Sequence, residues 1–463
     1  MMTEHEPLTV TLAKWAHRVA FADLPQDVVD ATKLRILDVV GLALAGADTP
    51  FGRATRAAAA AMSPPGPCRI FGGGERVGVT TAAFANGSCA QALEYDDTHN
   101  ESIVHMSSPA VAAALALSET RTISGQDLVL AIALGNEISC RVGSVAPGQF
   151  HKRGFHPTGL FAPFGVTYLA GRLLGLDTRQ MAQAAGICGS FAAGILECWV
   201  DGTHPKFLHP GWAAQSAISA AYLAREQMTG PAQVLEGRFG LFASHLQAPD
   251  TPPDFDRVIG GLGSKWDSRN SSLKPFPAAH VIHPYLNALL RIRAAHAVTP
   301  ADVERIDVPV ASFIVPIVCE PVAEKFAPAS DSHGRVSLQY SLAEALHAGS
   351  LGRHAYSADS LRNPEILALA RRVQYHVDPS FPGPGRFKGA VHVVLKDGRT
   401  FDEVEEYNRG SAQNPMTYRE IRGKFSENAS AFLSQAARDR LADEIGQIER
   451  LPDASALVGL AVA

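Results

Sequence analysis

Apolar residues recur at helical spacing almost without interruption from Leu8 to about Gln247. Many of the faces that must pack carry alanine or glycine, whose small side chains let helix axes approach closely. This pattern predicts a compact core of many helices in the first half of the chain. The clearest predicted helices cover residues 12–19, 28–44, 80–92, 110–117, 127–142, 160–174, 178–196 and 213–227.

Alternating patterns typical of strands appear only later, at 303–310 and near 374–377, and a hairpin is predicted from 391–395 and 400–404. Helical patterning covers 284–296 and 341–347 and returns over 418–451. A chain of 463 residues exceeds one ordinary core. We therefore expect a mainly α protein. A large all-helical domain would be built from both chain ends (1–266 and 406–463), a smaller α+β lid domain (267–405) would be inserted, and a pocket would lie between them.

The composition excludes several classes of protein. The net charge of −5 and the lack of a basic tract or Gly-rich phosphate loop argue against nucleic-acid partners. The six cysteines form no Cys-x-x-Cys pair, which argues against disulfide, zinc and iron–sulfur frameworks. No apolar run is long enough to span a membrane, and the first seven residues lack the apolar core of a signal peptide, so a cytoplasmic protein is expected.

The segment from Leu93 to Pro109 joins two of the predicted helices and concentrates polar side chains. Its acids, including Glu94 and Asp97, follow the end of a helix, where the helix dipole disfavours negative charge. His105 precedes the next helix, which Ser108 is expected to cap and whose first N–H groups favour an anion. The local pattern fits either a polar interhelical loop or an active site.

Other polar residues stand at predicted helix starts. Four of the 17 histidines precede proline, among them His156 and His283, and proline readily opens a helix. Lys206 and Lys274 lie in apolar, proline-rich surroundings, whereas most lysines are solvated surface charges. Several imidazoles near neutral pKa and fixed positive charges are what proton transfer on a carboxylate substrate needs.

Taken together, five blocks of the sequence resemble the MmgE/PrpD family, and they occur in the family's order over about residues 8–425. That family includes 2-methylcitrate dehydratase, cis-aconitate decarboxylase and iminodisuccinate epimerase. The resemblance implies an all-helical domain, a smaller α+β lid, a homodimer and a site in the cleft that needs no cofactor or metal. The blocks are Glu94–Thr98 with His105, Gly154–Thr158, Asp201-Gly202 with Lys206, Lys274–Pro277 with His283, and Asn408–Gly410 with Asn414–Thr417.

Matching the family's motifs to this chain assigns roles to individual residues. The resemblance implies the catalytic residues His105, His156, Lys206, His283 and Tyr340, and the substrate-binding residues Glu94, Asp97, Thr98 and Lys274. It assigns no role to His209 or His245. Three departures stand out: Glu94 replaces an aspartate, Pro277-Ala278-Ala279 replaces Pro-Cys-Cys, and one extra residue separates Thr98 from His105.

The expected function is a cofactor-free lyase acting on a small di- or tricarboxylate, with dehydration by histidine acid–base chemistry as the leading hypothesis. Epimerisation of a dicarboxylate and decarboxylation of a cis-aconitate-like acid remain open, because all three reactions need the same residues. A binding protein with an inactive site is the alternative from another class. His99 and His105, with the acids nearby, could imitate a metal site, but we expect a metal-independent enzyme.

Overall fold

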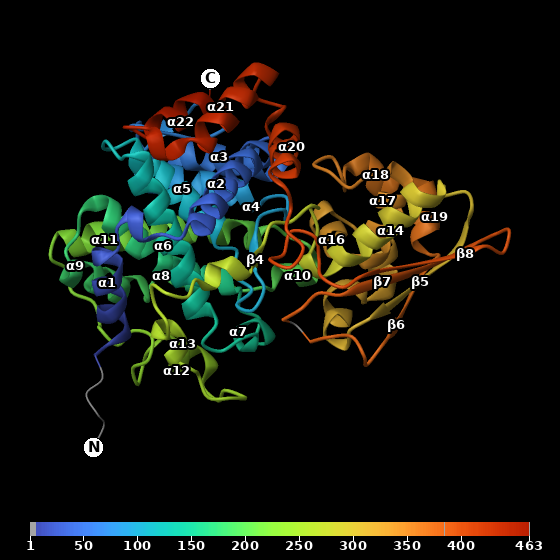
Figure 1. The fold of residues 1–463 in the computed structure, drawn as a ribbon, viewed down its shortest axis with the longest axis horizontal. Coiled ribbons are helices and arrows are strands. Elements are labelled where there is room, and N and C mark those ends of the chain that lie inside the picture. Colours follow the sequence, from blue (N-terminus) through green and yellow to red (C-terminus); the bar gives the residue numbers. More distant parts are fainter. Residues whose placement is uncertain (1–5, 384, 463) are drawn as a thin grey trace.

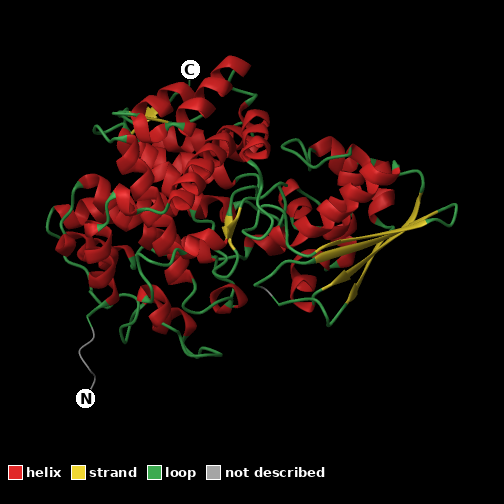
Figure 2. Cartoon of the chain, viewed as in Figure 1, coloured by secondary structure: helices red, strands yellow, loops and turns green. Residues whose placement is uncertain are grey.

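The computed structural model describes residues 6–383 and 385–462. It is mainly helical, with a smaller part that contains a sheet, which confirms the predicted fold class (Figures 1 and 2). The helices of the larger part are α1 (Leu8–Arg18), α2 (Gln26–Ala47), α3 (Pro50–Met62), α4 (Val79–Gln91), α5 (Ser107–Ser118), α6 (Gly125–Gly143), α7 (Gln149–Lys152), α8 (Pro157–Leu174), α9 (Thr178–Cys188), α10 (Cys198–Asp201), α11 (His209–Arg225), α12 (Leu241–Leu246), α13 (Asp256–Ile259), α20 (Tyr418–Ala429), α21 (Gln435–Gly446) and α22 (Ser455–Ala461).

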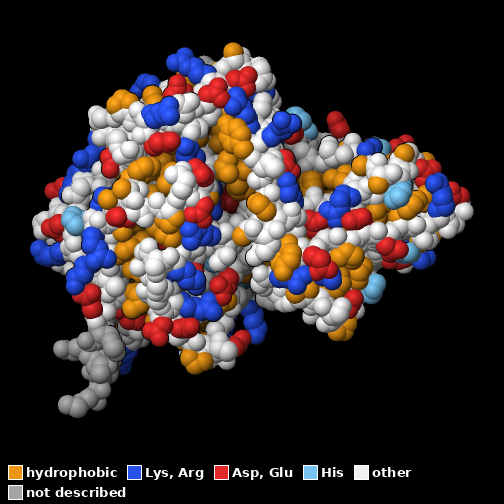
Figure 3. Space-filling model, viewed as in Figure 1, with side chains coloured by type: hydrophobic (Ala, Val, Ile, Leu, Met, Phe, Trp, Pro, Cys, Tyr) orange, Lys and Arg blue, Asp and Glu red, His pale blue; other side chains and the backbone are white. Residues whose placement is uncertain are grey.

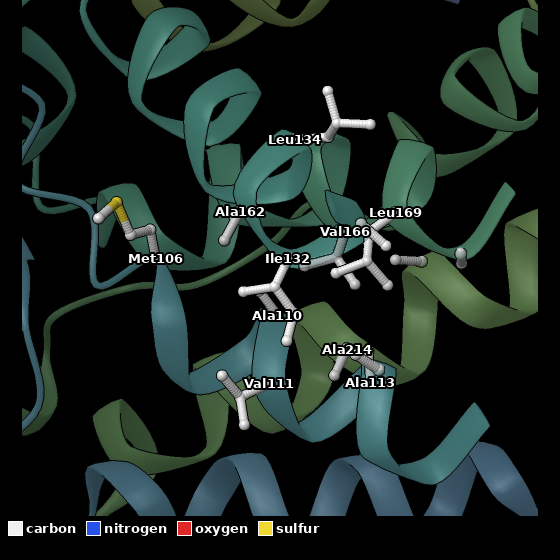
Figure 4. Packing of buried hydrophobic residues seen from close by; sticks show 14 of the residues in the cluster. Met106, Ala110, Val111, Ala113, Ile132, Leu134, Ala162, Val166, Leu169 and Ala214 are labelled. Carbon is white, nitrogen blue, oxygen red and sulfur yellow. The ribbon is translucent and has the colours of Figure 1, made fainter. Parts of the chain in front are cut away.

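Small residues set the spacing of the central helices. α5 lies among α4, α6, α8 and α11, and its alanines face Ile132 of α6 and Val166 of α8 (Figure 4). A Cβ atom on Gly165 of α8 would lie 2.0 Å from the carbonyl oxygen of Gly135 in α6. Only glycine therefore permits these two helices to approach so closely, as the Ala/Gly pattern predicts.

The smaller part is an α+β unit. Its sheet has the order β6 (Val373–Val377), β5 (Val303–Val310), β7 (Gly389–Leu395) and β8 (Thr400–Glu405). β5 and β6 are parallel, and the other two pairings are antiparallel. The helices of this part, two of which (α14 and α17) lie over the sheet in Figure 1, are α14 (His283–His296), α15 (Val322–Phe326), α16 (Asp331–Arg335), α17 (Leu338–Ala348), α18 (Ala358–Arg362) and α19 (Pro364–Ala370).

The two parts have separate hydrophobic cores. One buried cluster draws on residues 8–266 and 421–461, so that both chain ends build it, and a second draws on residues 276–395. This division supports an inserted domain, while boundaries at 266 and 406 stay a prediction. On the face in Figure 3, acidic and basic side chains are intermixed over both parts. No helix within the described residues has the length and apolarity needed to cross a membrane.

Short strands link distant segments. β1 (Cys68–Arg69) and β2 (Arg76–Val77) form a small hairpin around a glycine-rich turn. β3 (Thr98–His99) pairs with β4 (Ser271–Ser272). The pairing of β3 with β4 ties the acidic segment to the start of the α+β part. The sequence pattern missed these strands because each has only two residues.

Two predicted helix ends were wrong. Ser108 does not cap α5, because the helix already begins at Ser107 and both serine hydroxyls donate to the carboxylates of Asp96 and Asp97. The helix predicted for 178–196 ends at Cys188. Gly194, with φ of 155°, lies in the loop that follows, and its carbonyl oxygen accepts a hydrogen bond from the His156 N–H. Such a backbone is incompatible with a helix.

Candidate active site

A cavity of about 610 Å³ lies between the helical part and the α+β part. It is continuous with an outer hollow of about 700 Å³, since six residues, including His151 and Trp199, line both. The helical part lines the inner cavity with Glu94, Thr98, Asn100, Ile103, His105, Gly148, His151, Lys152, His156, Trp199 and Lys206. The rest of the wall is formed by Lys274, Ala279, His280, Val281, Phe313, Pro316, Ile317, Val336 and Phe387.

Glu94 is held between two lysines. Its carboxylate pairs with the ammonium of Lys206 on one oxygen and lies 3.1 Å from Lys274 Nζ on the other. Lys274 also donates to the Glu94 carbonyl oxygen at 3.0 Å. Burial alone would raise the pKa of Glu94, but the two lysines bring this pKa well below its usual range. The group is thus an ionised carboxylate with two cations, and it leaves a net positive charge at the cavity wall.

The backbone at Glu94 is unusual for a residue with a side chain. Its φ of 53° is left-handed, and the residue follows the C-terminal end of α4. Left-handed residues other than glycine are uncommon and concentrate at functional sites. The conformation directs the carboxylate towards Lys206 and Lys274, which come from segments more than 110 residues away.

His105 lies beside this carboxylate. Its Nε2 is 4.0 Å from a Glu94 oxygen, and its Nδ1 is 3.1 Å from Asp96 and 3.4 Å from the Thr98 hydroxyl. The backbone N–H donates to the Thr158 hydroxyl of α8 at 3.0 Å, which fixes the segment on the helical body. A carboxylate at Nδ1 favours a proton on that nitrogen and leaves Nε2 to act on a ligand.

His156, the residue before α8, is part of a pair of imidazoles. Its Nδ1 lies 2.8 Å from His209 Nδ1, and its buried Nε2 has no hydrogen-bond partner within the described residues. A Cβ atom on Gly194 would lie 3.1 Å from the His209 ring, so glycine makes room for the pair. Burial and His209 lower the pKa of His156 well below its usual value, and burial and Lys206 lower that of His209 to about 4. Both rings are therefore neutral at pH 7.

The wall contributed by the α+β part is largely apolar, with Val281, Phe313, Ile317 and Phe387 among its members. His280 is its one histidine in the described lining. The Asn408 side-chain amide donates to His280 Nε2 at 2.8 Å, while the buried Nδ1 has no partner in the same part of the chain. Burial, together with His283 and Lys274, lowers the pKa of His280 well below its usual value.

The structure brings six of the nine sequence-predicted site residues into the cavity wall. These are Glu94, Thr98, His105, His156, Lys206 and Lys274. Asp97 lies behind them, accepting hydrogen bonds from Ser107 and pairing with Arg35 at 3.5 Å. It therefore supports the start of α5 and the segment that carries His105, and it does not reach the cavity.

His283 and Tyr340 are also absent from the wall. Nε2 of His283 lies 2.9 Å from the Ala278 carbonyl oxygen, within the turn that opens α14, and His283 is fully buried. Tyr340 is equally buried inside α17, and its ring centre lies 6.0 Å from that of Tyr356 in a tilted arrangement. The nearby His280 occupies the position on the cavity that the sequence analysis gave to His283.

Sequence reasoning missed His280, His209, His151 and Trp199. His280 lies within the Lys274–His283 block but does not precede proline, and the His-Pro pattern therefore favoured His283. His209 does precede proline, yet its contact with His156 depends on the meeting of α8 and α11, which no local pattern encodes. Lys206 Nζ lies 5.8 Å from the Trp199 ring centre, a cation–π contact that helps to hold this lysine.

The residues present do not form an evident metal centre. Across residues 6–383 and 385–462, no three His, Cys, Asp or Glu side chains are grouped so that they could hold a metal ion. On the sequence alone, His99 could imitate a metal ligand. In the structure its Nδ1 lies 2.8 Å from the Ser102 hydroxyl. A metal-independent reaction stays a prediction.

Known protein families and individual proteins match this chain over nearly its full length. The model of the MmgE/PrpD N-terminal domain matches residues 10–254, and that of the MmgE/PrpD C-terminal domain matches residues 276–448. The chain is 28% identical over 471 residues to a cis-aconitate decarboxylase of Aspergillus terreus, covering 98% of this chain and 95% of that protein. The cis-aconitate decarboxylases of Homo sapiens (28% over 468 residues) and Mus musculus (27% over 466) are matched over 98% of this chain and over 94% and 93% of their own lengths.

Proposed function

Because the chain belongs to the MmgE/PrpD family, we propose that it is a lyase that removes one carboxylate, as CO2, from a small unsaturated tricarboxylate of the cis-aconitate class. Relatives that carry the name cis-aconitate decarboxylase match it along almost its whole length. The observation that supports the proposal is the composition of the cavity, where buried lysines and imidazoles face a wall of the α+β part that is mainly apolar apart from Lys274 and His280.

The lysine pair gives the substrate its binding site. Lys206 and Lys274 together carry two positive charges against the single carboxylate of Glu94, and one charge remains for a substrate carboxylate. Lys152, which also lines the cavity, is paired with Asp250 at 2.7 Å and adds no net charge. A polyanionic acid of the tricarboxylate class satisfies this excess, whereas a neutral ligand does not.

The apolar wall favours loss of the carboxylate that faces it. A carboxylate placed against Phe313, Ile317 and Phe387 loses water contacts, and CO2, being neutral, does not need them. The bond between that carboxylate and its carbon breaks, and the electron pair moves through the neighbouring double bond to the carbon beside a remaining carboxylate. The charge that develops there is stabilised by Lys206 and Lys274.

His105 supplies the proton that completes the step. In the imidazolium form its charge is balanced by Asp96 at 3.1 Å. Transfer of its Nε2 proton to the carbon leaves a neutral imidazole, CO2 and a dicarboxylate with a shifted double bond. Solvent then restores the proton through the outer hollow. The overall reaction consumes one proton and needs no oxidant, metal or cofactor.

One observation favours dehydration of a citrate-like hydroxy acid as a second candidate. His156 is neutral and buried, and its Nε2 has no partner in the described chain, as a base that removes a proton next to a carboxylate requires. His105, whose ring centre lies 5.6 Å away, would then protonate the leaving hydroxyl. Both candidates use the same side chains and differ in whether CO2 or water leaves.

A substrate comparison tests the proposal. Purified enzyme is incubated with cis-aconitate or with 2-methylcitrate, in the presence of a strong chelator, and CO2 and organic products are followed by 13C and 1H NMR. We expect CO2 from cis-aconitate in equal amount to substrate lost, with no need for added metal. Water loss from 2-methylcitrate without CO2 would instead establish the second candidate, and inactivity restored by one metal would overturn the metal-free step.

The family resemblance also implies a homodimer, and the sequence itself separately led to an expected location in the cytoplasm. Both statements stay proposals. Light scattering on the purified chain measures the first: a particle of about twice the chain mass of 49.2 kDa is expected, and a monomer that is fully active would contradict it.

A further inference from the structure

Asn408 lies behind His280, on the segment that follows β8. It is buried, with 2% of its surface exposed, and its side-chain amide nitrogen contacts two acceptors. One is His280 Nε2 at 2.8 Å, and the other is the hydroxyl of Ser272 at 3.3 Å. Ser272 in turn donates to the Asn100 side-chain oxygen at 3.0 Å, and Asn100 lines the cavity.

The direction of each hydrogen bond in this chain follows from the number of hydrogens. A hydroxyl has a single hydrogen, and that of Ser272 is directed to Asn100, so Ser272 accepts from Asn408. The amide of Asn408 has two hydrogens, and the second is directed to His280. Nε2 of His280 must therefore accept, and in a neutral imidazole the proton then sits on Nδ1.

From this arrangement we propose that Asn408 is a positioning residue that holds His280 as the Nδ1–H tautomer, a fixed hydrogen-bond donor to a substrate carboxylate. The choice of ligand rests on the proposed function, while the tautomer does not. His280 lines the cavity, and its buried Nδ1 is without a partner in the described residues, as a donor reserved for a ligand would be.

The same contact opposes a second proton on His280. An imidazolium would bring its Nε2–H against the N–H of Asn408, so that two donors would face each other. The titratable groups around the ring are His283, with ring centres 5.2 Å apart, and Lys274, His105 and Glu94. Three of these four are bases whose protonated forms add to the repulsion. His280 is thus a permanent neutral donor, and proton transfer is left to His105 and His156.

The assignment makes the isosteric change Asn408→Asp informative. Aspartate keeps the shape of asparagine but can only accept at this position, so it draws the imidazole proton to Nε2 and leaves Nδ1 as an acceptor facing the substrate. The variant Asn408→Leu removes the hydrogen bond to His280 without placing an acceptor beside Nε2. Asn363→Asp, at the half-buried cap of α19, is the matched control, because aspartate serves equally well as a helix cap.

Nitrogen-15 NMR of histidine-labelled enzyme without substrate measures the tautomer directly, with His280→Gln used to assign the resonances. We expect Nδ1–H in the wild type at pH 6–8, and Nε2–H with a higher pKa in Asn408→Asp. An Nε2–H tautomer in the wild type would overturn the assignment whether or not any variant folds. Because no substrate is present, a failure of the proposed lyase activity would leave this result unaffected.

Kinetics with cis-aconitate then test the role in catalysis. Asn408→Asp is expected to lower kcat by about 10²-fold, the scale of losing one fixed donor to a developing charge, and to shift the acid limb of the pH profile upward. Asn408→Leu should lower kcat less, without the pH shift, and Asn363→Asp should match the wild type. Wild-type kcat and pH profile in Asn408→Asp would overturn the positioning role.

Discussion

The two walls of the cavity differ in kind. The helical part contributes ionised and titratable groups, Glu94, His105, His156 and Lys206, each held by a buried partner. The α+β part contributes mainly apolar side chains, together with the neutral His280 and, from the segment that leads into this part, Lys274. Buried charges need many fixed counter-groups, and a packed body of helices supplies them from several segments at once. A wall whose task is to exclude water needs only shape and apolar surface.

The largest effect is expected from a change at His105, the proposed proton donor in the helical wall of the cavity. Replacing His105 with Gln should lower kcat by about 10²–10⁴-fold, because general acid help is lost while packing is kept. His392→Gln, on the sheet of the α+β part, is the control and should leave kcat unchanged. Steady-state kinetics with cis-aconitate measure both. Equal kcat in the two variants would remove His105 from the chemistry.

The second prediction concerns the imidazole pair. The family's motifs gave His209 no role and led to the expectation that it tolerates Gln, but its 2.8 Å contact with His156 reverses that expectation. His209→Phe should lower kcat by about 10-fold, the loss of one buried hydrogen bond that fixes a tautomer, and His156→Gln by more. His245→Gln, outside the cavity wall, should change neither kcat nor thermal stability. If His209→Phe matches the His245 variant, the pair has no role in catalysis.

The third prediction separates binding from chemistry within the charged wall. Lys206→Met keeps the aliphatic stem but removes one of the two cations on Glu94. We expect KM to rise by about 10-fold or more, because a clamp holds bound substrate and transition state alike, with a smaller fall in kcat. Lys265→Met, at an exposed lysine, is the control. A loss confined to kcat would contradict the binding role and leave Lys206 only its part in stabilising the developing charge.

The fourth prediction tests the apolar wall. Ile317→Gln preserves volume but brings a polar group, and with it water, to the face where the lost carboxylate is proposed to lie. We expect kcat to fall by about 10-fold with little change in KM, since the destabilising effect of desolvation is reduced. The same exchange at the exposed Ile259 should have no effect. An unchanged or higher kcat in Ile317→Gln would show that dryness of this wall does not assist the reaction.

The smallest expected effect is on stability at low pH. Burial lowers the pKa of His99, His151 and His209 to about 4. Below pH 6.5 these histidines bind protons in the unfolded chain but stay neutral in the folded protein. The free energy of unfolding should therefore fall between pH 6.5 and 4. Asp38, whose pKa burial raises to about 6, acts in the opposite direction, as do Asp97 and Glu344, whose pKa values burial also raises. These acids are outnumbered, because three further buried histidines also have a lowered pKa.

Urea unfolding at pH 7.5, 6 and 5 measures this slope. The variant His99→Asn removes one of the three histidines and should flatten the slope, whereas the exposed His376→Asn should not. Unfolding free energies that are equal at pH 7.5 and 5 would contradict the burial of neutral imidazoles.

Most of the helices could be predicted because their alanine and glycine faces repeat at 3.6 residues, and the strand 303–310 was predicted at its observed bounds because its burial alternates. Local motifs led to Glu94, Lys206 and Lys274, which line the cavity. The position of His283 could not be predicted because packing decides it: the turn before α14 buries His283 and leaves His280 on the cavity. Likewise, Tyr340 packs into the separate core of the α+β part, and no local pattern shows that it is kept from the cavity.

The central claim is that the helical wall, through His105, delivers the proton after CO2 leaves beside the apolar wall. Turnover of cis-aconitate in D2O, with NMR analysis of the product, tests this claim most directly. We expect one deuteron per CO2, placed on a single face of the carbon next to a carboxylate, and loss of both rate and facial selectivity in His105→Gln. Full facial selectivity at wild-type rate in that variant, or deuteration without CO2, would contradict it.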